Sequence, residues 1–364
     1  MPENQNSLKK SIIENVPLAQ FTTLGIGGAA KYFIEVTSSG MLDAAVAWAQ
    51  HQHLPMFILG GGSNVVIADE GFAGLVIRLG IGGIESHIEK HQAIVEAGAG
   101  VEWDAFVAFC VANQWAGVEC LSGIPGKVGA TPIQNVGAYG QEVSETIMHV
   151  KAFDTQSRRL VEISASQCQF AYRASRFKLQ DRNCFIVTNV TYQLAVNGKP
   201  SIRYNELQKY FAEEIISKIS LAEVREAVIA IRRRKAMVID ANDTDSRSAG
   251  SFFVNPIVTH AEFEQVKQRA GKYVSDIAAM PAFATANNQI KLSAAWLIEH
   301  AGIGRGHIHG NVGTSTKHSL AIINRGGGTA REILQLCKKI QAQVMEVFGV
   351  ALQPEPVFIG FEAL

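Results

Sequence analysis

Hydrophobic and polar positions in the first half of the chain alternate between the period of a helix and that of a strand. The segment 38–54, SSGMLDAAVAWAQHQHL, has helical spacing, and Ser38 or Ser39 is a suitable N-cap. The segment 102–115 predicts a second, amphipathic helix. Strands are predicted at 29–38, 55–59, 74–79 and 93–100.

The second half mixes longer helices with short strands. The segment 150–164 predicts a β-hairpin with its turn near Thr155–Ser157. Helices are predicted at 220–237, 291–302 and 330–349, and strands at 184–194, 319–324 and 356–360. The sequence 240–250, DANDTDSRSAG, is a polar loop, and the best division of the chain falls near residues 200–220.

Composition limits the classes of function. The 364 residues are 47% hydrophobic and 18% charged, which predicts a packed core large enough for two domains. Lys plus Arg and Asp plus Glu number 33 each, so no global field attracts nucleic acid or a membrane surface. No apolar run approaches the roughly 18 residues that span a bilayer, and the first residues lack the apolar core of a signal peptide. Scattered cysteines indicate reduced thiols in a cytoplasmic protein; they are Cys110, Cys120, Cys168, Cys184 and Cys337.

A run of glycines, GGGSN at residues 60–64, follows a predicted strand directly. Consecutive glycines let successive backbone N–H groups converge on one anion, and Ser63 and Asn64 add donors. The run is neither a Gly-Lys-Ser/Thr phosphate loop nor a GxGxxG fingerprint. Alone, it predicts a tight turn as readily as an anion site.

A second glycine-rich stretch, SGIPGKVGATPIQNVGAYG, occupies residues 122–140. It is too long for a simple turn, and its few charges suit close contact of the backbone with a planar or phosphorylated ligand. One elaborate Ω-loop is the structural alternative. Two such segments in one domain suit the two ends of a cofactor that contains a pyrophosphate.

The sequence YRASRFK, residues 172–178, holds three cations, Arg173, Arg176 and Lys178. If it is extended, Arg173 faces away from the other two and reaches a ligand carboxylate, while they remain solvated. A solvated surface is the alternative for all three. The basic cluster Arg232–Lys235 is likewise expected to be a solvated helix C-terminus.

Two segments near proline place polar groups beside apolar ones. In GSFFVNP, residues 250–256, Phe252–Val254 predict the start of a buried strand, with Ser251 at its edge and Asn255 beyond it. Ser251 is either a capping residue or a proton donor. In QPEPVFIG, prolines on both sides restrict the backbone around Glu355, which is either a functional carboxylate or part of a rigid entry to the last strand.

Other chemistries lack support in the sequence. His307 and His309 have no neighbouring Cys or Asp that completes a tetrahedral set, so no metal site is predicted. No GxSxG element indicates a hydrolase.

In combination and in this order, TTLGIGGAAKYF and the five motifs above closely resemble the UDP-N-acetylenolpyruvoylglucosamine reductase family over nearly the whole chain. The resemblance implies an α+β fold: an FAD-binding domain of the vanillyl-alcohol-oxidase (PCMH) type at 17–200, then a smaller α+β substrate-binding domain at 215–364. It implies non-covalent FAD, with NADPH as hydride donor. The implied reaction converts UDP-N-acetylglucosamine-enolpyruvate to UDP-N-acetylmuramate for peptidoglycan synthesis, in a cytoplasmic monomer with no nucleic-acid or membrane partner.

The resemblance also implies roles for residues. Arg173, Ser251 and Glu355 match catalytic positions; hydride passes from flavin N5 to C3 of the substrate, and Ser251 protonates C2. Substrate positions are Tyr204, Lys235 and Asn255, and Tyr204 marks the longer form with a tyrosine-bearing loop. FAD positions are Gly60, Gly61, Gly62, Ser63, Asn64, Gly123, Ile124, Pro125, Gly126, Gly129, Ala130, Gln134, Asn135, Gly137, Ala138 and Tyr139.

The chain departs from the family pattern at two places, and two other readings stay open. Gln353 and Pro356 replace the commoner residues around Glu355, and the loop between Lys235 and Ser251 is longer than usual. A sugar or alcohol oxidase of the same fold would share the glycine loops and need not combine Arg173, Ser251 and Glu355. A non-catalytic nucleotide-sugar-binding protein would bind no FAD.

Overall fold

The chain forms two compact units in the computed structural model, which describes residues 8, 10–212, 215–274, 277, 280–285 and 287–361. Unit one comprises residues 1–16, 30–62 and 73–238; unit two comprises residues 17–29, 63–72 and 239–364. The units differ from the expected ranges 17–200 and 215–364. Residues 201–238 lie in unit one, and the short segments 17–29 and 63–72 lie in unit two.

The first sheet of unit one has four described strands and includes a parallel pair. Its order is β1 (Ile13–Pro17), β2 (Ala29–Val36), β5 (Phe72–Leu79) and β3 (Met56–Leu59). β3 and β5 run parallel, with Met56 opposite Leu75. Helix α2 (Ser39–His51) begins as the sequence predicts, because the Ser38 hydroxyl accepts a hydrogen bond from the Met41 N–H. Its buried Leu42 and Val46 pack in one core with Leu75.

The second sheet of unit one is antiparallel, and two helices accompany it. Its strands, in spatial order, are β12 (Arg159–Ser164), β11 (Ile147–Asp154), β13 (Phe185–Val196), β7 (Gln92–Gly98) and β6 (Ile84–Glu89), with β8 (Trp115–Ala116) also on β13. The predicted hairpin is confirmed as β11 and β12, with its turn at residues 155–158. Phe106 of α3 (Trp103–Ala112) packs on Tyr192, with ring centroids 4.6 Å apart.

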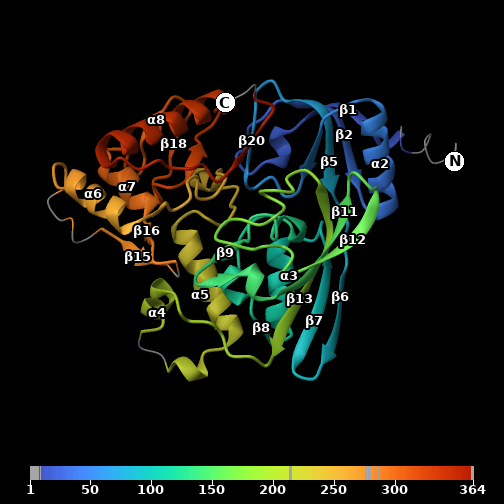
Figure 1. Ribbon diagram of the computed structural model, residues 1–364, viewed down its shortest axis with the longest axis horizontal. Coiled ribbons are helices and arrows are strands. Elements are labelled where there is room, and N and C mark those ends of the chain that lie inside the picture. The colour runs from blue at the N-terminus through green and yellow to red at the C-terminus, as the bar shows by residue number, and fades with distance from the viewer. Residues whose placement is uncertain are drawn as a thin grey trace. The chain divides into compact units, whose positions relative to one another are not determined.

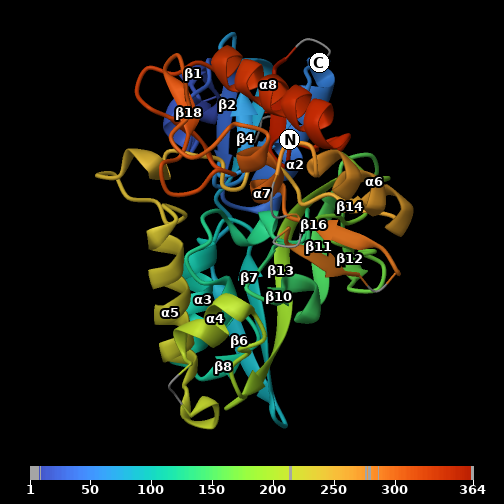
Figure 2. The ribbon, with the colours of Figure 1, turned by 90° about the vertical axis from the view of Figure 1, so that its left-hand side faces the viewer.

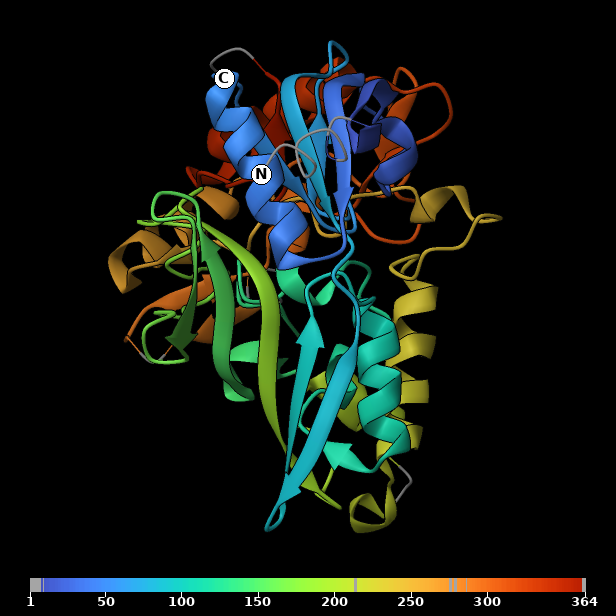
Figure 3. The ribbon, with the colours of Figure 1, turned by 90° about the vertical axis from the view of Figure 1, so that its right-hand side faces the viewer.

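Helix α5 (Leu221–Arg234) lies beside α3, as Figures 2 and 3 show. A capping box between Ser220 and Glu223 starts α5. Arg225 then binds both carboxylate oxygens of Asp104 on α3, at 2.6 and 2.7 Å. This bidentate pair fixes α5 against α3. Shorter elements of unit one are α4 (Asn205–Tyr210), β9 (Gly137–Ala138) and β10 (Gln141–Glu142).

Unit two packs three helices with small sheets around one core, and α8 is the long red helix of Figure 1. The helices are α6 (His260–Ala270), α7 (Ala294–His300) and α8 (Ala330–Phe348). The strands are β4 (Val65–Ile67) parallel to β20 (Val357–Ile359); β14 (Ile257–Val258), β16 (Ile290–Leu292) and β15 (Ala282–Ala284); and β17 (Ile308–His309), β18 (Val312–Thr314) and β19 (Ile322–Asn324). Two carboxylate oxygens of Asp69 accept from the N–H groups of Ala330 and Arg331 and anchor the start of α8.

Most of the predicted helices and strands are confirmed, with one correction at the GSFFVNP motif. Residues 252–254 are extended and buried or half-buried, but they form no regular strand. Their backbone is held from two directions: the Phe252 N–H donates to Leu320 O at 2.7 Å, and the Val254 N–H donates to Gln353 O at 3.0 Å. Phe253 forms one isolated antiparallel β-bridge with Pro354, in place of the ladder that a strand would make.

Candidate functional site

The two glycine-rich loops touch each other within unit one. A Cβ added at Gly61 would lie 2.6 Å from the Cα of Gly126, closer than real side chains allow. At Gly60 an added Cβ would have ordinary contacts, 3.7 Å from Ala130. The first loop therefore needs glycine where its backbone meets the second loop.

Several groups hold the second loop in place. The Gly123 N–H donates to Asp104 Oδ1 at 2.6 Å, and Arg232 Nε donates to Gly123 O at 3.2 Å. The Trp103 N–H donates to Gly126 O at 2.9 Å. Asp104 thus supports both the loop and α5, and the Arg225 and Gly123 bonds keep its pKa below the ordinary value although burial acts to raise it.

The backbone of these loops suits an anionic cofactor. Among the described residues, the N–H groups of Gly61, Ile124 and Gly126 donate to no protein acceptor. Converging N–H groups without intervening side chains are a recurrent phosphate-binding arrangement. The residues present therefore fit the pyrophosphate of FAD at this place.

Farther along the second stretch, the structure assigns an internal role to the side chain of Asn135, one of the expected cofactor residues. Asn135 is buried, and its amide donates to Glu142 Oε2 at 2.8 Å and accepts from the Ser144 N–H at 3.1 Å. Its side chain supports the loop, so a contribution of Asn135 to cofactor binding is limited to its backbone. Asn135 and Tyr139 both have φ of +49°, an uncommon left-handed conformation that concentrates at functional sites.

Arg173 lies in a tight turn, contrary to the extended conformation considered above. The backbones of Ala171 and Ala174 exchange hydrogen bonds of 3.0 and 3.1 Å, and Arg173 has φ of +53°. Its Nη2 donates to Gly137 O at 2.8 Å. The guanidinium therefore lies beside the second glycine-rich stretch.

The other two cations of this motif are not merely solvated. Arg176 Nε contacts Asp181 Oδ2 at 2.5 Å, and the Arg176 side chain is only 24% exposed. Lys178 Nζ donates to Arg173 O at 3.0 Å. Lys178 therefore fixes the turn that carries Arg173, whereas Arg176 pairs with Asp181, and the expectation that both are solvated is wrong.

The expected substrate residues Tyr204 and Lys235 gather around Tyr139. Tyr204 and Tyr139 pack edge to face with centroids 5.5 Å apart, and Lys235 Nζ lies 6.0 Å from the centroid of the Tyr139 ring. Burial raises the pKa of Tyr139 to about 12, so its hydroxyl is a proton-bearing donor at neutral pH. Lys235 also pairs with Glu206 at 2.6 Å.

A pocket of about 210 Å³ lies next to this group, lined by Glu206, Lys209, Tyr210, Ile231, Arg234 and Lys235. Its three cations suit an anionic ligand. The prediction that Arg232–Lys235 is a solvated helix end is wrong in part. Arg233 and Arg234 are exposed, whereas Arg232 donates to Met237 O at 2.7 Å as well as to Gly123 O.

Glu119 is a residue that sequence reasoning missed. It is fully buried, and its carboxylate accepts from Gln141 Nε2, the Ser201 N–H and the Gly117 N–H, each at 2.8 Å. These bonds join the approach to the second glycine-rich stretch, the segment after Tyr139 and the start of the Tyr204 loop. No local pattern marks it, because two of its three partners, Gln141 and Ser201, are distant in the sequence.

The segments that carry Ser251 and Glu355 are paired in unit two. The Glu355 N–H donates to the carbonyl of Phe252, the residue after Ser251, at 2.9 Å. The Val357 N–H donates to Asn64 O at 3.0 Å, so Asn64 belongs to the same group of segments. The Ser251 hydroxyl is half-buried and has no hydrogen-bond partner within the described parts of the chain.

Asn255 also lies in unit two, where it supports a helix. Its Oδ1 accepts from the Ala294 N–H at 2.9 Å, at the first residue of α7. One side of its amide is thus used in the fold.

The described part of the chain shows neither a metal cluster nor a membrane-spanning helix. It holds no group of three or more His, Cys, Asp or Glu side chains arranged for a metal ion. None of its helices combines the length and apolar character needed to cross a membrane.

Comparisons with known proteins agree with this geometry. A family model described as an FAD binding domain matches residues 30–162, and one described as the C-terminal domain of UDP-N-acetylenolpyruvoylglucosamine reductase matches residues 240–359. The UDP-N-acetylenolpyruvoylglucosamine reductase of Thermobifida fusca is 46% identical over 353 residues, 96% of this chain and 98% of its own. That of Streptomyces avermitilis is 42% identical, over 96% of this chain and 95% of its own.

A solved structure supports the fold. That of UDP-N-acetylenolpyruvylglucosamine reductase from Thermus caldophilus covers 96% of this chain and 98% of its own, with a TM-score of 0.62 at 22% identity. The α+β class with an FAD-binding domain is confirmed.

The glycine loops and the matching FAD domain define an FAD-binding oxidoreductase. More narrowly, the chain belongs to the UDP-N-acetylenolpyruvoylglucosamine reductase family.

Replacing Gly61 by alanine is expected to weaken FAD binding. Overpacking costs about 1–3 kcal/mol, which corresponds to roughly 5- to 150-fold in the dissociation constant if the cofactor loop bears the strain. Titration of the apoprotein with FAD, followed by flavin fluorescence, measures the change. Gly40→Ala is the matched control, because a Cβ at Gly40 meets nothing within 4 Å. Equal affinities for both variants and the wild type would show that the contact does not shape the site.

Proposed function

We propose that this protein is an NADPH-dependent flavoenzyme that reduces UDP-N-acetylglucosamine-enolpyruvate to UDP-N-acetylmuramate in peptidoglycan synthesis. The relatives that match over almost the whole chain carry the name of that reductase. The observation that supports the proposal is the hydrogen bond from the Glu355 N–H to Phe252 O, which joins the segment that follows Ser251 to the segment of Glu355. A flavin oxidase of the same fold has no need of that pair.

The substrate explains the need for a fixed cation. Its enol ether double bond is electron-rich, so C3 accepts hydride only if negative charge moves toward the neighbouring carboxylate. The FAD, once reduced by NADPH, supplies that hydride. Arg173, held by Gly137 O and Lys178, binds the carboxylate and stabilises the charge that develops there.

The intermediate then needs a proton at C2 from one face. Ser251 supplies it from a short side chain on a backbone held by Leu320 and Glu355. Glu355 orients the reacting carbon atoms of the intermediate. The product gains one hydride at C3 and one proton at C2, so atoms and electrons balance.

The nucleotide-sugar binds through its own set of residues in this proposal. Tyr204, which packs on Tyr139 of the expected cofactor residues, offers a hydroxyl donor, and Lys235 offers a cation for the diphosphate. Asn255 contributes the part of its amide that Ala294 does not use. NADPH binds at the same site before the substrate does, so the two ligands occupy this site in turn.

We also propose that the enzyme works as a monomer in the cytoplasm. The five cysteines are free thiols, four of them buried, which suits a reducing compartment.

The FAD is proposed to be held without a covalent bond, because the glycine loops bind through backbone groups. Acid precipitation should therefore release all of the yellow colour into the supernatant, measured by absorbance. Colour retained by the washed pellet would contradict this.

Arg173→Lys is expected to lower kcat by about 10²-fold or more, since lysine keeps the charge but loses the planar two-bond contact with a carboxylate. Steady-state assays with the enolpyruvyl substrate measure it. Arg182→Lys, at an exposed arginine of the same unit, is the control and should behave as wild type. Near-normal turnover by Arg173→Lys would remove Arg173 from the carboxylate site.

Ser251→Ala is expected to separate the two half-reactions. Loss of a positioned general acid costs about 10²–10⁴-fold, or roughly 3–5 kcal/mol of barrier, and only reoxidation by the substrate needs that proton. Rapid-mixing absorbance should show normal bleaching by NADPH and a slow return of colour. If both halves slow equally, the defect is structural; if neither slows, the proton comes from another group.

A further inference from the structure

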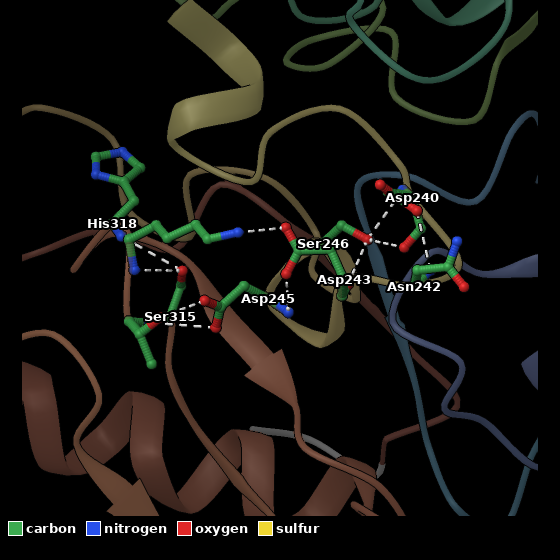
Figure 4. Close-up of polar contacts among 9 residues, drawn as sticks. Asp240, Asn242, Asp243, Asp245, Ser246, Ser315 and His318 are labelled. Atoms are coloured by element: carbon green, nitrogen blue, oxygen red, sulfur yellow. Dashed lines mark hydrogen bonds and ion pairs between the residues drawn. The ribbon is translucent and has the colours of Figure 1, made fainter.

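The polar loop 240–250, which precedes Ser251, is fastened to the segment 315–320 of the same unit. Figure 4 shows the carboxylates of Asp243 and Asp245 directed toward the segment that carries Ser315 and His318. The loop is the long insertion between Lys235 and Ser251 that the sequence singles out, and neither FAD nor substrate binding accounts for it.

Asp245 makes the central contact. It is only 7% exposed, and its carboxylate accepts from the Thr316 N–H at 3.1 Å and from Thr316 Oγ1 at 2.5 Å. No cation pairs with it among the described residues. Burying a carboxylate costs desolvation free energy. The two hydrogen bonds from Thr316 offset that cost only when the two segments are in this arrangement.

An ion pair strengthens the same attachment. Lys317 Nζ lies 2.6 Å from Asp243 Oδ2, and Asp243 Oδ1 accepts from the Asp245 N–H at 3.1 Å. On the facing segment, Ser315 Oγ accepts from the N–H of Lys317 at 3.0 Å. Each side of the contact thus also has a hydrogen bond within its own segment.

The attachment continues to Ser251. The Asn324 N–H donates to Arg247 O at 3.0 Å, and the Phe252 N–H donates to Leu320 O at 2.7 Å. Between these points, the Gly250 N–H donates to Ser248 Oγ at 3.2 Å, and Gly250 has φ of +74°. Ser251 therefore lies on a short bridge whose two ends are both fixed to residues 315–324.

We propose that Asp245 and Thr316, assisted by the Asp243–Lys317 pair, are positioning residues for Ser251. The inference rests on the proposed function, in which Ser251 donates the proton to C2. The Ser251 hydroxyl has no hydrogen-bond partner within the described residues, so its position depends on the backbone. A displacement of about 1 Å at a reacting group costs on the order of 10²-fold in rate.

The first test compares Thr316→Val with Thr316→Ser. Valine keeps the shape but leaves an Asp245 oxygen without its hydroxyl donor; serine keeps that donor. Reoxidation of the flavin by the enolpyruvyl substrate should slow roughly 10- to 100-fold in Thr316→Val and stay near the wild-type rate in Thr316→Ser. Bleaching by NADPH should be unchanged in both. Equal slowing of the two half-reactions, or no change in Thr316→Val, would overturn the proposal.

The second test is a double-mutant cycle of Asp245→Ala and Ser251→Ala. If Asp245 acts through Ser251, Asp245→Ala slows reoxidation in the wild-type background and causes no further slowing once Ser251 is alanine. Glu264→Ala is the matched control, because the exposed Glu264 pairs with Lys267 of its own helix, α6, and belongs to neither segment of the attachment; it should leave both half-reactions unchanged. Melting temperatures confirm that each variant is folded during the assay.

The outcomes of this cycle separate the two proposals. Slowdowns that multiply would show that Asp245 acts independently of Ser251 and would overturn the positioning role alone. A normal rate for Asp245→Ala with a slow Ser251→Ala would do the same. A normal rate for Ser251→Ala would instead overturn the proton-donor role and, with it, the inference.

Discussion

The close contact between Gly61 and Gly126 is the constraint on which the cofactor site of unit one depends. Two backbones can approach in this way only without side chains, and the N–H groups of Gly61 and Gly126 donate to no protein acceptor among the described residues. Asp104 holds the arrangement in place because it binds Gly123 on one side and Arg225 of α5 on the other. The helix that ends at the expected substrate residue Lys235 is therefore fixed to the same carboxylate as the cofactor loop.

Unit two carries the other two expected catalytic residues, Ser251 and Glu355. Its central segment, residues 252–254, is neither helix nor regular strand, and single backbone bonds hold it to Leu320 on one side and to Gln353 and Glu355 on the other. The large rings of Phe252 and Phe253 are fully or almost fully buried and prevent the segment from sliding. A rigid apolar anchor next to a half-buried serine is a suitable support for directional proton transfer.

Much of the site could be predicted from the sequence because its signals are local. The glycine loops, the prolines around Glu355 and the order of motifs are all readable along the chain, and they led to the FAD-binding family. The conformation around Arg173 could not be read, because a left-handed residue other than glycine persists only when surrounding contacts impose it. The prediction of an extended conformation for residues 172–178 is therefore wrong, and so is the expected solvation of Arg176 and Lys178.

The sequence by itself determined helices α2, α3, α5, α7 and α8, strands that include β2, β5, β7 and β13, the cap at Ser38 and the identity of the glycine loops, since periodicity, capping and chain flexibility act over a few residues. Tertiary structure alone decided which polar groups are buried and which hydrogen-bond partners they have. Glu119 meets Ser201, Arg232 meets Gly123, and Asp245 meets Thr316, each across many intervening residues. A charged side chain shows no local mark of its future partner, because the cost of burying it is offset only when distant segments bring their donors together.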